Sequence, residues 1–362
     1  MLELIPPGLR IDFLRKAKAA IALSILVILI GIGSIIVHGG LNLGIDFTGG
    51  TLVQLRFTQP VNLGTIREVL GTLDLSQGVV QEFGDPREVL IRVATVPEGT
   101  EDIGTHVRQA LQARLPDESI DLRRVEVVGP QVSTDLRQKA LFALFYAILG
   151  IVIYISGRFE AKWLAALGLS IALFAVTYGI TQWLPGISPS ILIVVALLVT
   201  VAFCLFLQLR YALAAIIALF HDVLITVGFF SVFDKSFNLP IVAALLTIVG
   251  YSLNDTIIVF DRIRENLHGS RREQFTNIVN ASVNQTLSRT VLTSGTTLAV
   301  VLSLFFLGGE VIHNFAFALL IGVIAGTYSS IFIASPLLVY WDALGAGQLV
   351  FGRRSSKARA GR

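Results

Sequence analysis

The sequence predicts a polytopic α-helical membrane bundle of about eight transmembrane helices with one small α+β, ferredoxin-like extracytoplasmic domain. Three observations support this prediction. Hydrophobic residues make up 54% of the 362 residues and charged residues 15%, and the mean hydropathy of +0.75 exceeds that of ordinary soluble domains. Apolar runs of about 20 residues, the length that crosses a bilayer, recur along the chain. One long polar segment, residues 39–138, separates the first two runs.

The apolar runs define the expected spans. We expect helices at residues 19–38, 139–157, 163–184, 190–209, 211–233, 240–260, 286–307 and 314–341. Basic residues precede the first run, as in a signal peptide, but this run is long enough to span and lacks an A-x-A cleavage pattern. We therefore interpret it as a retained anchor, followed by the outer domain and a transmembrane bundle over 139–341.

Basic residues orient the helices, since they precede the first span and then recur at every second boundary. The later clusters are Arg158 with Lys162, Arg210, Arg262 with Arg264, and Arg271 with Arg272. Both termini, residues 1–18 and the basic tail 342–362, are therefore expected in the cytoplasm. The polar tract 262–284 is amphipathic, and we expect it to lie along the cytoplasmic surface. A net charge of +3 gives no indication of nucleic-acid binding.

The polar segment 39–138 carries its own element signals. Alternating apolar residues predict a strand over 51–57, two strands around Gly84-Asp85-Pro86 and a last strand in IDLRRVEVV, with helices after the first and third strands. The order β-α-β-β-α-β is typical of a ferredoxin-like sandwich. No cluster of catalytic residue types is visible in this segment.

An ionisable residue within a transmembrane helix costs about 2.5 to 3.5 kcal/mol on insertion scales and therefore indicates a function. Asp255 is the strongest case, because Ser252, Asn254 and Thr256 accompany it on the same helix. Arg289 enters a helix of opposite direction at similar depth and could pair with Asp255. An arginine favours the ionised carboxylate and burial the protonated one, a balance that a proton carrier requires. The alternative is a static ion pair that only fixes helix packing.

His221 and Asp222 form a second polar site, about halfway along the span 211–233. Histidine titrates near neutrality, so an auxiliary relay role, with Asn254 as a further candidate, and a packing role are both open. Glu310 and His313 fall in an expected outer loop, where solvation is the simpler account.

No residue pattern favours an enzyme. The single cysteine, Cys204, allows neither an intrachain disulfide nor a cysteine-based metal site. No nucleophile–base pair or metal-ligand set is visible, so we expect no catalysis and no cofactor. A carboxylate with hydroxyl neighbours can carry H⁺ or Na⁺, and we expect H⁺ as the coupling ion, with Na⁺ as the alternative.

Six ordered motifs give the chain a resemblance to a known family. They are GIDFTGGT at 44–51, VVGPQVSTDLRQKA at 127–140, ALFHDVLITVGFF at 218–230, GYSLNDTIIVFDRIREN at 250–266, SRTVLTSGTT at 288–297 and GTYSSIFIASPLL at 326–338. Together they resemble the SecF branch of the SecD-SecF protein-export family, within the resistance-nodulation-division superfamily. The resemblance implies that Asp255 is the proton-relay aspartate and Arg289 its arginine partner.

The same resemblance implies a setting and partners. A family member of this kind lies in the bacterial inner membrane and uses the proton-motive force to promote export and release of preproteins. The implied partners are a SecD-like subunit, the SecYEG translocon and the translocating preprotein, with YajC and YidC as further candidates. Residues 158–209 interrupt the six-span pattern of the family, and we expect this insertion to add a helix pair that preserves the orientation of later spans.

Two other functions remain open on the residues alone. One is a proton-coupled exporter of small molecules or lipids from the same superfamily, which would need a partner because this chain supplies half of the expected spans. The other is a structural scaffold subunit without ion coupling.

Overall fold

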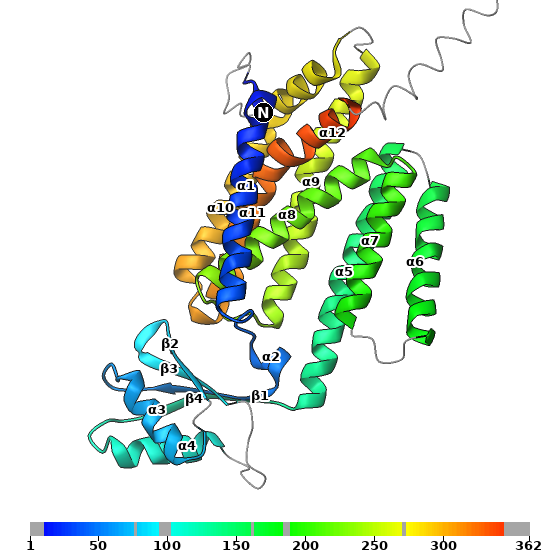
Figure 1. Ribbon diagram of the computed structural model, residues 1–362. Coiled ribbons are helices and arrows are strands. Elements are labelled where there is room, and N and C mark those ends of the chain that lie inside the picture. Colours follow the sequence, from blue (N-terminus) through cyan, green and yellow to red (C-terminus); the bar gives the residue numbers. More distant parts are fainter. Residues whose placement is uncertain are drawn as a thin grey trace, which may run out of the picture.

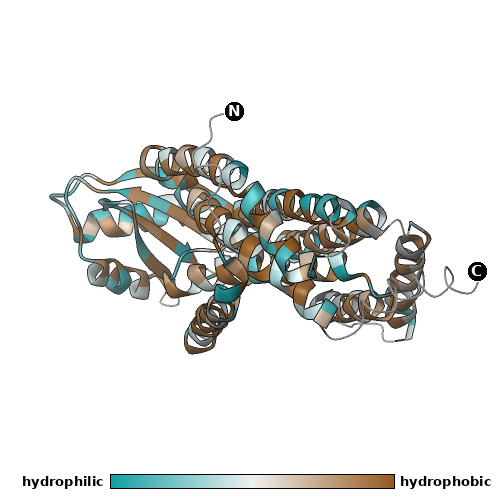
Figure 2. Ribbon diagram, turned by 90° about the horizontal axis from the view of Figure 1, so that it is seen from above, coloured by the Kyte–Doolittle hydropathy of each residue, from teal (hydrophilic) through white to brown (hydrophobic). Residues whose placement is uncertain are grey.

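The computed structural model describes residues 11–75, 78–93, 103–160, 163–183, 189–269 and 273–343. Figure 1 shows long helices that lie side by side, with a small sheet domain attached at one end, which we call the domain end of the bundle. The long helices carry mostly hydrophobic residues, whereas polar residues are frequent on the small domain (Figure 2). The predicted fold class, a helical membrane bundle with a small α+β domain, is confirmed.

Six described helical segments are long and apolar enough to cross a membrane. They are α1 (Phe13–Val37), α5 (Pro130–Glu160), α8 (Arg210–Val232), α9 (Leu239–Gly269), α10 (Phe275–Leu307) and α11 (Glu310–Ser329), which continues through a π-helical turn (Ser330–Ala334) into α12 (Ser335–Trp341). Leu23, Leu26 and Leu29 of α1 are exposed, as expected of a helix whose outer face contacts lipid.

The segment 158–209, expected to add a helix pair, forms α6 (Trp163–Trp183) and α7 (Pro189–Phe206). Both helices pack on α5, and α7 also contacts α8 (Figure 1). The eight expected spans thus correspond to the six segments above and to this added pair.

The polar tract 262–284 is not a separate helix, because α9 and α10 extend into it from either side. Its placement along the cytoplasmic surface stays a prediction. Ile263 and Val279 are fully buried, so part of the apolar face of the tract packs inside the protein. Asn266 Nδ2 donates to Ser282 Oγ at 2.8 Å and joins the extensions directly.

The small domain has the predicted order of elements. They are β1 (Gly50–Arg56), α3 (Leu63–Thr72), β2 (Val79–Phe83), β3 (Asp85–Val93), α4 (Ile103–Arg114) and β4 (Asp121–Val128). The strands form one antiparallel sheet in the order β2-β3-β1-β4, as in a ferredoxin-like sandwich. Because side chains alternate along a strand, Val53 and Leu55 are buried against the helices, while Leu52 and Gln54 line the side toward the bundle.

Residues 42–46 connect the small domain to the bundle. Leu43 forms a parallel β-bridge with Phe237 in the loop between α8 and α9, and Phe237 N donates to Asn42 O at 2.7 Å. From β3, Arg92 donates through Nη1 to Leu43 O at 2.6 Å and through Nη2 to Asn42 Oδ1 at 2.5 Å. The sheet is therefore joined, through one short segment, to the loop that precedes α9.

Two further contacts join the domain to the helices. Asp46, in the short helix α2 (Ile45–Thr48), accepts a hydrogen bond from Leu239 N, the first residue of α9, at 2.8 Å. Glu310, the first residue of α11, lies against Gly84 in the turn between β2 and β3. Glu310 and His313 lie in α11 rather than in a loop. Glu310 is exposed, as expected, whereas His313 is half-buried and packs against Phe305 of α10.

Candidate functional site

Asp255 lies near the centre of α9 and is 1% exposed. Ser294 of α10 donates a hydrogen bond through Oγ to Asp255 Oδ2 at 3.3 Å, and Thr327 of α11 donates through Oγ1 to Ser294 Oγ at 2.7 Å. Three helices thus contribute a line of oxygen atoms that begins at a buried carboxylate. Because a hydroxyl both donates and accepts, such a line is chemically able to pass a proton.

Arg289 does not form an ion pair with Asp255 in the described part of the chain. Its side chain is exposed on α10, and its charge acts on the carboxylate only through space. Asn254 is exposed as well, since neighbouring positions of a helix point about 100° apart and Asp255 points inward. The structure therefore brings Asp255 together with hydroxyl groups rather than with the guanidinium.

His221 and Asp222 form a second buried site, on α8, and Asp222 is 0% exposed. Asp222 Oδ1 lies 2.9 Å from His221 Nδ1. Asp222 Oδ2 accepts hydrogen bonds from Ser252 Oγ of α9 at 2.5 Å and from Ser329 Oγ of α11 at 2.9 Å. The carboxylate is thus completely enclosed by hydrogen-bonding groups from three helices.

The imidazole of His221 extends this network to α1. Its Nε2 lies 2.9 Å from Ser24 Oγ, and its ring stacks on Tyr328 with 5.9 Å between ring centroids. Tyr328 accepts a hydrogen bond from Ser24 Oγ at 3.2 Å and donates one to Ala20 O at 2.6 Å. Four of the membrane helices, α1, α8, α9 and α11, therefore meet at this one site.

The two sites share two helices. Ser252 and Asp255 lie one turn apart on α9, while Thr327 and Ser329 are neighbours in the last turn of α11. Gly326 allows α11 to approach α9 at this level, because any side chain there would collide with Ser252. A displacement of α11 along α9 would therefore change a hydrogen bond of Asp222 directly, and that of Ser294, the partner of Asp255.

Sequence reasoning found the ionisable members of these sites but missed Ser24, Thr327, Tyr328 and Ser329. A hydroxyl within an apolar run is a weak signal, because serine and threonine commonly bond to their own helix backbone. Only the contact between distant segments identifies these four residues. The described residues contain no group of three or more His, Cys, Asp and Glu that could hold a metal ion.

Comparisons with known families give consistent matches. The family described as "Protein export membrane protein SecD/SecF, C-terminal" matches residues 107–206 and 188–343, and the family "SecD/SecF GG Motif" matches residues 34–61. The protein translocase subunit SecF of Desulfurispirillum indicum is 42% identical over 337 residues, which cover 91% of each chain. That of Magnetococcus marinus is 44% identical over 336 residues, covering 91% of this chain and 92% of the relative.

Solved structures with the same fold include the SecDF protein of Thermus thermophilus, described as a translocon-associated membrane protein. It is 31% identical with a TM-score of 0.68, and the match covers 94% of this chain but 40% of the longer SecDF chain. A SecDF structure in a super-membrane-facing form has 30% identity and a TM-score of 0.58, over 97% of this chain and 41% of the other. The chain therefore belongs to the SecF family of protein translocase subunits, which places it in Sec protein export.

Proposed function

We propose that the chain couples the proton-motive force to the export and release of preproteins through protonation and deprotonation of Asp255. Its setting is the bacterial inner membrane, with both termini in the cytoplasm and the small domain in the periplasm. Its partners are a SecD-like subunit, which completes the transmembrane assembly, and the SecYEG channel, with YajC and YidC as further subunits. The proposed coupling ion is H⁺, with Na⁺ as the alternative.

The observation that carries this proposal is the line of oxygen atoms that runs from Asp255 through Ser294 to Thr327. A carboxylate that is 1% exposed and accepts a hydrogen bond from Ser294, which is itself bonded to Thr327, has a path for a proton across three helices. Moving one elementary charge through the membrane field is worth about 2.3 kcal/mol per 100 mV. One proton per cycle therefore supplies about 2.3 kcal/mol per 100 mV toward a shift of α11 against α9.

The geometry also suggests how a charge change would reach the small domain. Asp255 lies on α9, and the first residue of that helix bonds to Asp46 of the domain-linking segment 42–46. A shift of α9 would pull on this segment and, through Arg92, on the sheet. Arg289 is exposed in this structure. In this proposal it supplies positive charge to the site only when the helices rearrange.

The test is an export assay in membrane vesicles with an imposed ion gradient, comparing the native chain with Asp255→Asn. The amide is isosteric but cannot carry a proton, so we expect export to lose its dependence on the gradient. Separate proton and sodium gradients identify the coupling ion. Gradient-dependent export that is unchanged in Asp255→Asn would reject the coupling proposal and favour a structural scaffold.

A matched control lies on the same helix. Asp261 of α9 pairs with Arg158 at 2.6 Å, but its side chain is 41% exposed, so Asp261→Asn makes the same chemical change without altering a buried site. We expect native gradient dependence from this variant. A chain that transports small molecules or lipids under the same gradient without affecting preprotein export would instead be an exporter.

A further inference from the structure

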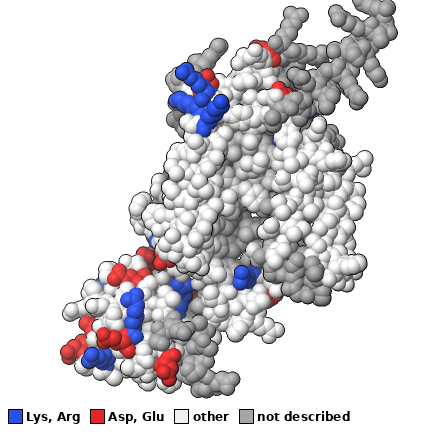
Figure 3. Space-filling view, viewed as in Figure 1, with Lys and Arg blue, Asp and Glu red and all other residues white. Residues whose placement is uncertain are grey.

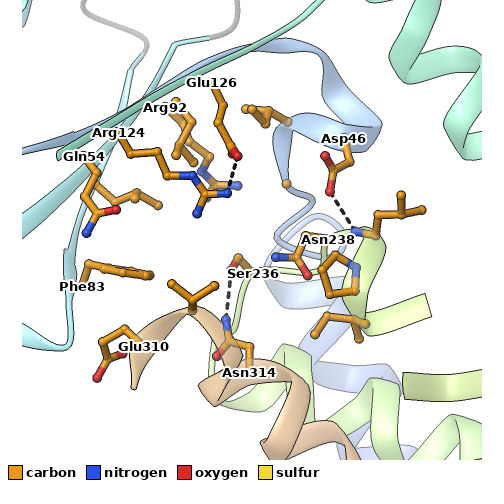
Figure 4. A pocket seen from close by; sticks show the side chains of 18 of the residues that line it. Asp46, Gln54, Phe83, Arg92, Arg124, Glu126, Ser236, Asn238, Glu310 and Asn314 are labelled. Atoms are coloured by element: carbon orange, nitrogen blue, oxygen red, sulfur yellow. Dashed lines mark hydrogen bonds and ion pairs between the residues drawn. The ribbon is translucent and has the colours of Figure 1, made fainter. Parts of the chain in front are cut away.

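His221 and Asp222 form a buried ionisable pair that the coupling proposal does not use. On the face of the molecule in Figure 3, charged side chains gather on the small domain and at the opposite end of the bundle, and the described surface between them is mostly uncharged. Charged groups at the domain end, such as Arg124 and Glu126, border a cavity (Figure 4). His221 is 5% and Asp222 0% exposed, so neighbouring side chains rather than solvent supply their hydrogen-bond partners.

The direction of each hydrogen bond on the His221 side can be assigned from the outer end of the network. Ala20 O can only accept, so Tyr328, 2.6 Å away, gives its one hydroxyl proton to it. Ser24 therefore donates to the hydroxyl oxygen of Tyr328, at 3.2 Å. Because this bond uses the one hydroxyl proton of Ser24, the 2.9 Å contact between Ser24 Oγ and His221 Nε2 requires the imidazole to donate. His221 Nε2 therefore carries a proton.

The Asp222 side of the network is assigned in the same way. Its Oδ2 atom accepts from Ser252 Oγ at 2.5 Å and from Ser329 Oγ at 2.9 Å. The other acceptor near Ser329 Oγ, Gly326 O, is farther away at 3.2 Å. The Oδ1 atom lies 2.9 Å from His221 Nδ1, and a hydrogen bond between these two atoms needs one proton. Since two donors already occupy Oδ2, that proton lies between Oδ1 and Nδ1.

This count of donors fixes the net charge of the pair. An imidazolium beside a carboxylate and a neutral imidazole beside a protonated carboxyl group both place one proton between Nδ1 and Oδ1, and both have zero net charge. An unpaired charge would be costly in this buried position, and neither arrangement leaves one. Asp255 differs, because within the described residues its carboxylate accepts one side-chain hydrogen bond, from Ser294, and has no cation as a direct partner.

The network also ends on an atom that cannot pass a proton onward. Transfer along a line of hydroxyl groups requires each group to release one proton and accept another. Tyr328 releases its proton toward the carbonyl oxygen of Ala20, which has no proton to release in turn. Transfer toward α1 is therefore blocked at this point. The same bonds instead hold α1 and α11 against α8.

We propose that the His221–Asp222 pair permanently holds one proton and serves as an uncharged positioning site for Asp255. This inference rests on the coupling proposal and adds a division of roles to it, in which Asp255 exchanges its proton and the pair keeps its own. The pair acts through α11, because Ser329 bonds to Asp222 and the nearby Thr327 bonds to the serine that donates to Asp255.

The first test compares Asp222→Asn with Asp255→Asn in the vesicle export assay. At position 222 the amide replaces the carboxylate together with the shared proton, since its Oδ1 can accept from both serines and its Nδ2 can donate to a neutral His221 Nδ1. We therefore expect Asp222→Asn to retain gradient-dependent export, whereas Asp255→Asn loses it. Loss in both variants would place Asp222 on the proton path and overturn the positioning role.

Asp222→Leu is the counterpart, similar in size but without a polar atom. It leaves Ser252, Ser329 and His221 Nδ1 without their partner, so we expect gradient-dependent export to fall by about tenfold or more. Thermal unfolding in detergent shows whether this variant folds. If it does not, Ser24→Ala takes its place, since it removes only the acceptor of Nε2 and should cause a smaller loss. Native export from the folded variant would overturn the positioning role.

Nitrogen-15 NMR of the full chain labelled at histidine tests the held proton without an export measurement. We expect His221 Nε2 to carry a proton in the native chain and in Asp222→Asn. Nδ1 should share a proton in the native chain and only accept one in the variant. His221→Gln identifies the signals of this residue among the five histidines of the sequence. An Nε2 without a proton in the native chain would overturn the inference.

These readouts separate the inference from the coupling proposal. Gradient dependence that survives in Asp255→Asn rejects the coupling proposal, whatever the NMR signals show. Gradient dependence that is lost in Asp222→Asn as well as in Asp255→Asn, or an unprotonated Nε2, overturns the role of the pair and leaves coupling through Asp255 intact.

Discussion

Ser252 and Gly326 face each other where α9 and α11 cross, and a Cβ built on Gly326 would lie 2.7 Å from Ser252 Cβ. Ser252 is also the residue that donates to the buried Asp222 at 2.5 Å, and it lies one turn from Asp255. A close approach of the two helices therefore coincides with the level at which both carboxylates are held. A change at this crossing should affect the hydrogen bonds of both sites.

The first prediction concerns that crossing. Gly326→Ala should force α11 away from α9 and destabilise the chain by about 1 to 3 kcal/mol, the usual cost of overpacking. Gradient-dependent export should fall as well, because Ser252 moves away from Asp222. The measurements are the unfolding midpoint in detergent and export in vesicles.

Gly250→Ala is the control for this prediction, because a Cβ at position 250 of α9 would meet no described atom within 4 Å. Alanine favours helix over glycine by about 1 kcal/mol, so this variant should be as stable as the native chain or more so. Equal losses in the two variants would show that the α9–α11 contact is unimportant.

The second prediction concerns Ser329, which donates to Asp222 Oδ2 at 2.9 Å. Ser329→Ala removes one partner of a fully buried carboxylate and should cost about 1 to 3 kcal/mol in the free energy of unfolding. Ser303→Ala removes an exposed hydroxyl of α10 whose one hydrogen bond within the described residues is to the backbone oxygen of Ala299, so it should change this free energy little. Denaturant or thermal unfolding of both variants measures the difference, and similar values would contradict a special role for Asp222.

The third prediction concerns the two hydrogen bonds that Arg92 donates to segment 42–46. Lysine keeps the charge but cannot reproduce two divergent donors, so Arg92→Lys should loosen this segment. Amide hydrogen exchange at residues 42–46 and 237 should rise by about tenfold or more, which corresponds to a loss of about 1.4 kcal/mol. Arg56→Lys is the control, because the Arg56 side chain is 37% exposed and its ion pair with Glu88 is long, at 3.8 Å. Unchanged exchange in Arg92→Lys would mean that the backbone bridge alone holds the segment.

The fourth prediction concerns acid sensitivity of the β2–β3 hairpin. Hydrogen bonds from Arg87 lower the pKa of Asp85 from its usual 3.8 to about 2. Because the folded-state pKa is depressed, the ionised carboxylate stabilises the fold above pH 3.8, and this contribution disappears as the pH falls toward 2. Asp85→Asn should therefore reduce the change in the unfolding midpoint between these pH values. An identical pH dependence in the native chain and the variant would show that the pair contributes nothing.

Much of the architecture was predictable from sequence because local patterns determine it. The apolar runs gave the spans, and strand alternation gave the order of the small domain. Helix rotation was not predictable. Arg289 and Ser294 lie on one helix at a spacing of i, i+5, which does not place both on one face. Their similar depth in the membrane could not indicate which of the two contacts Asp255, and the structure shows that it is Ser294. Asp222 accepts hydrogen bonds from Ser252 and Ser329, and its neighbour His221 contacts Ser24. These residues are far apart in the sequence, so only the packing of the helices brings them together.

The last prediction concerns the contact between Gly84 and Glu310, where the β2–β3 turn touches the first residue of α11. Gly84 has a φ of 71°, which a residue with a Cβ rarely adopts, and a Cβ there would also collide with the Glu310 side chain. Gly84→Ala therefore combines two effects, a backbone cost of about 1 to 2 kcal/mol and a clash between the domain and the bundle. A double-mutant cycle separates them, because Glu310→Ala relieves the clash but leaves the backbone cost unchanged. We expect Gly84→Ala to be less destabilising in the Glu310→Ala background, as measured by the free energy of unfolding. Additive values would mean that the turn moves freely away from α11 and that the domain is held at segment 42–46 alone.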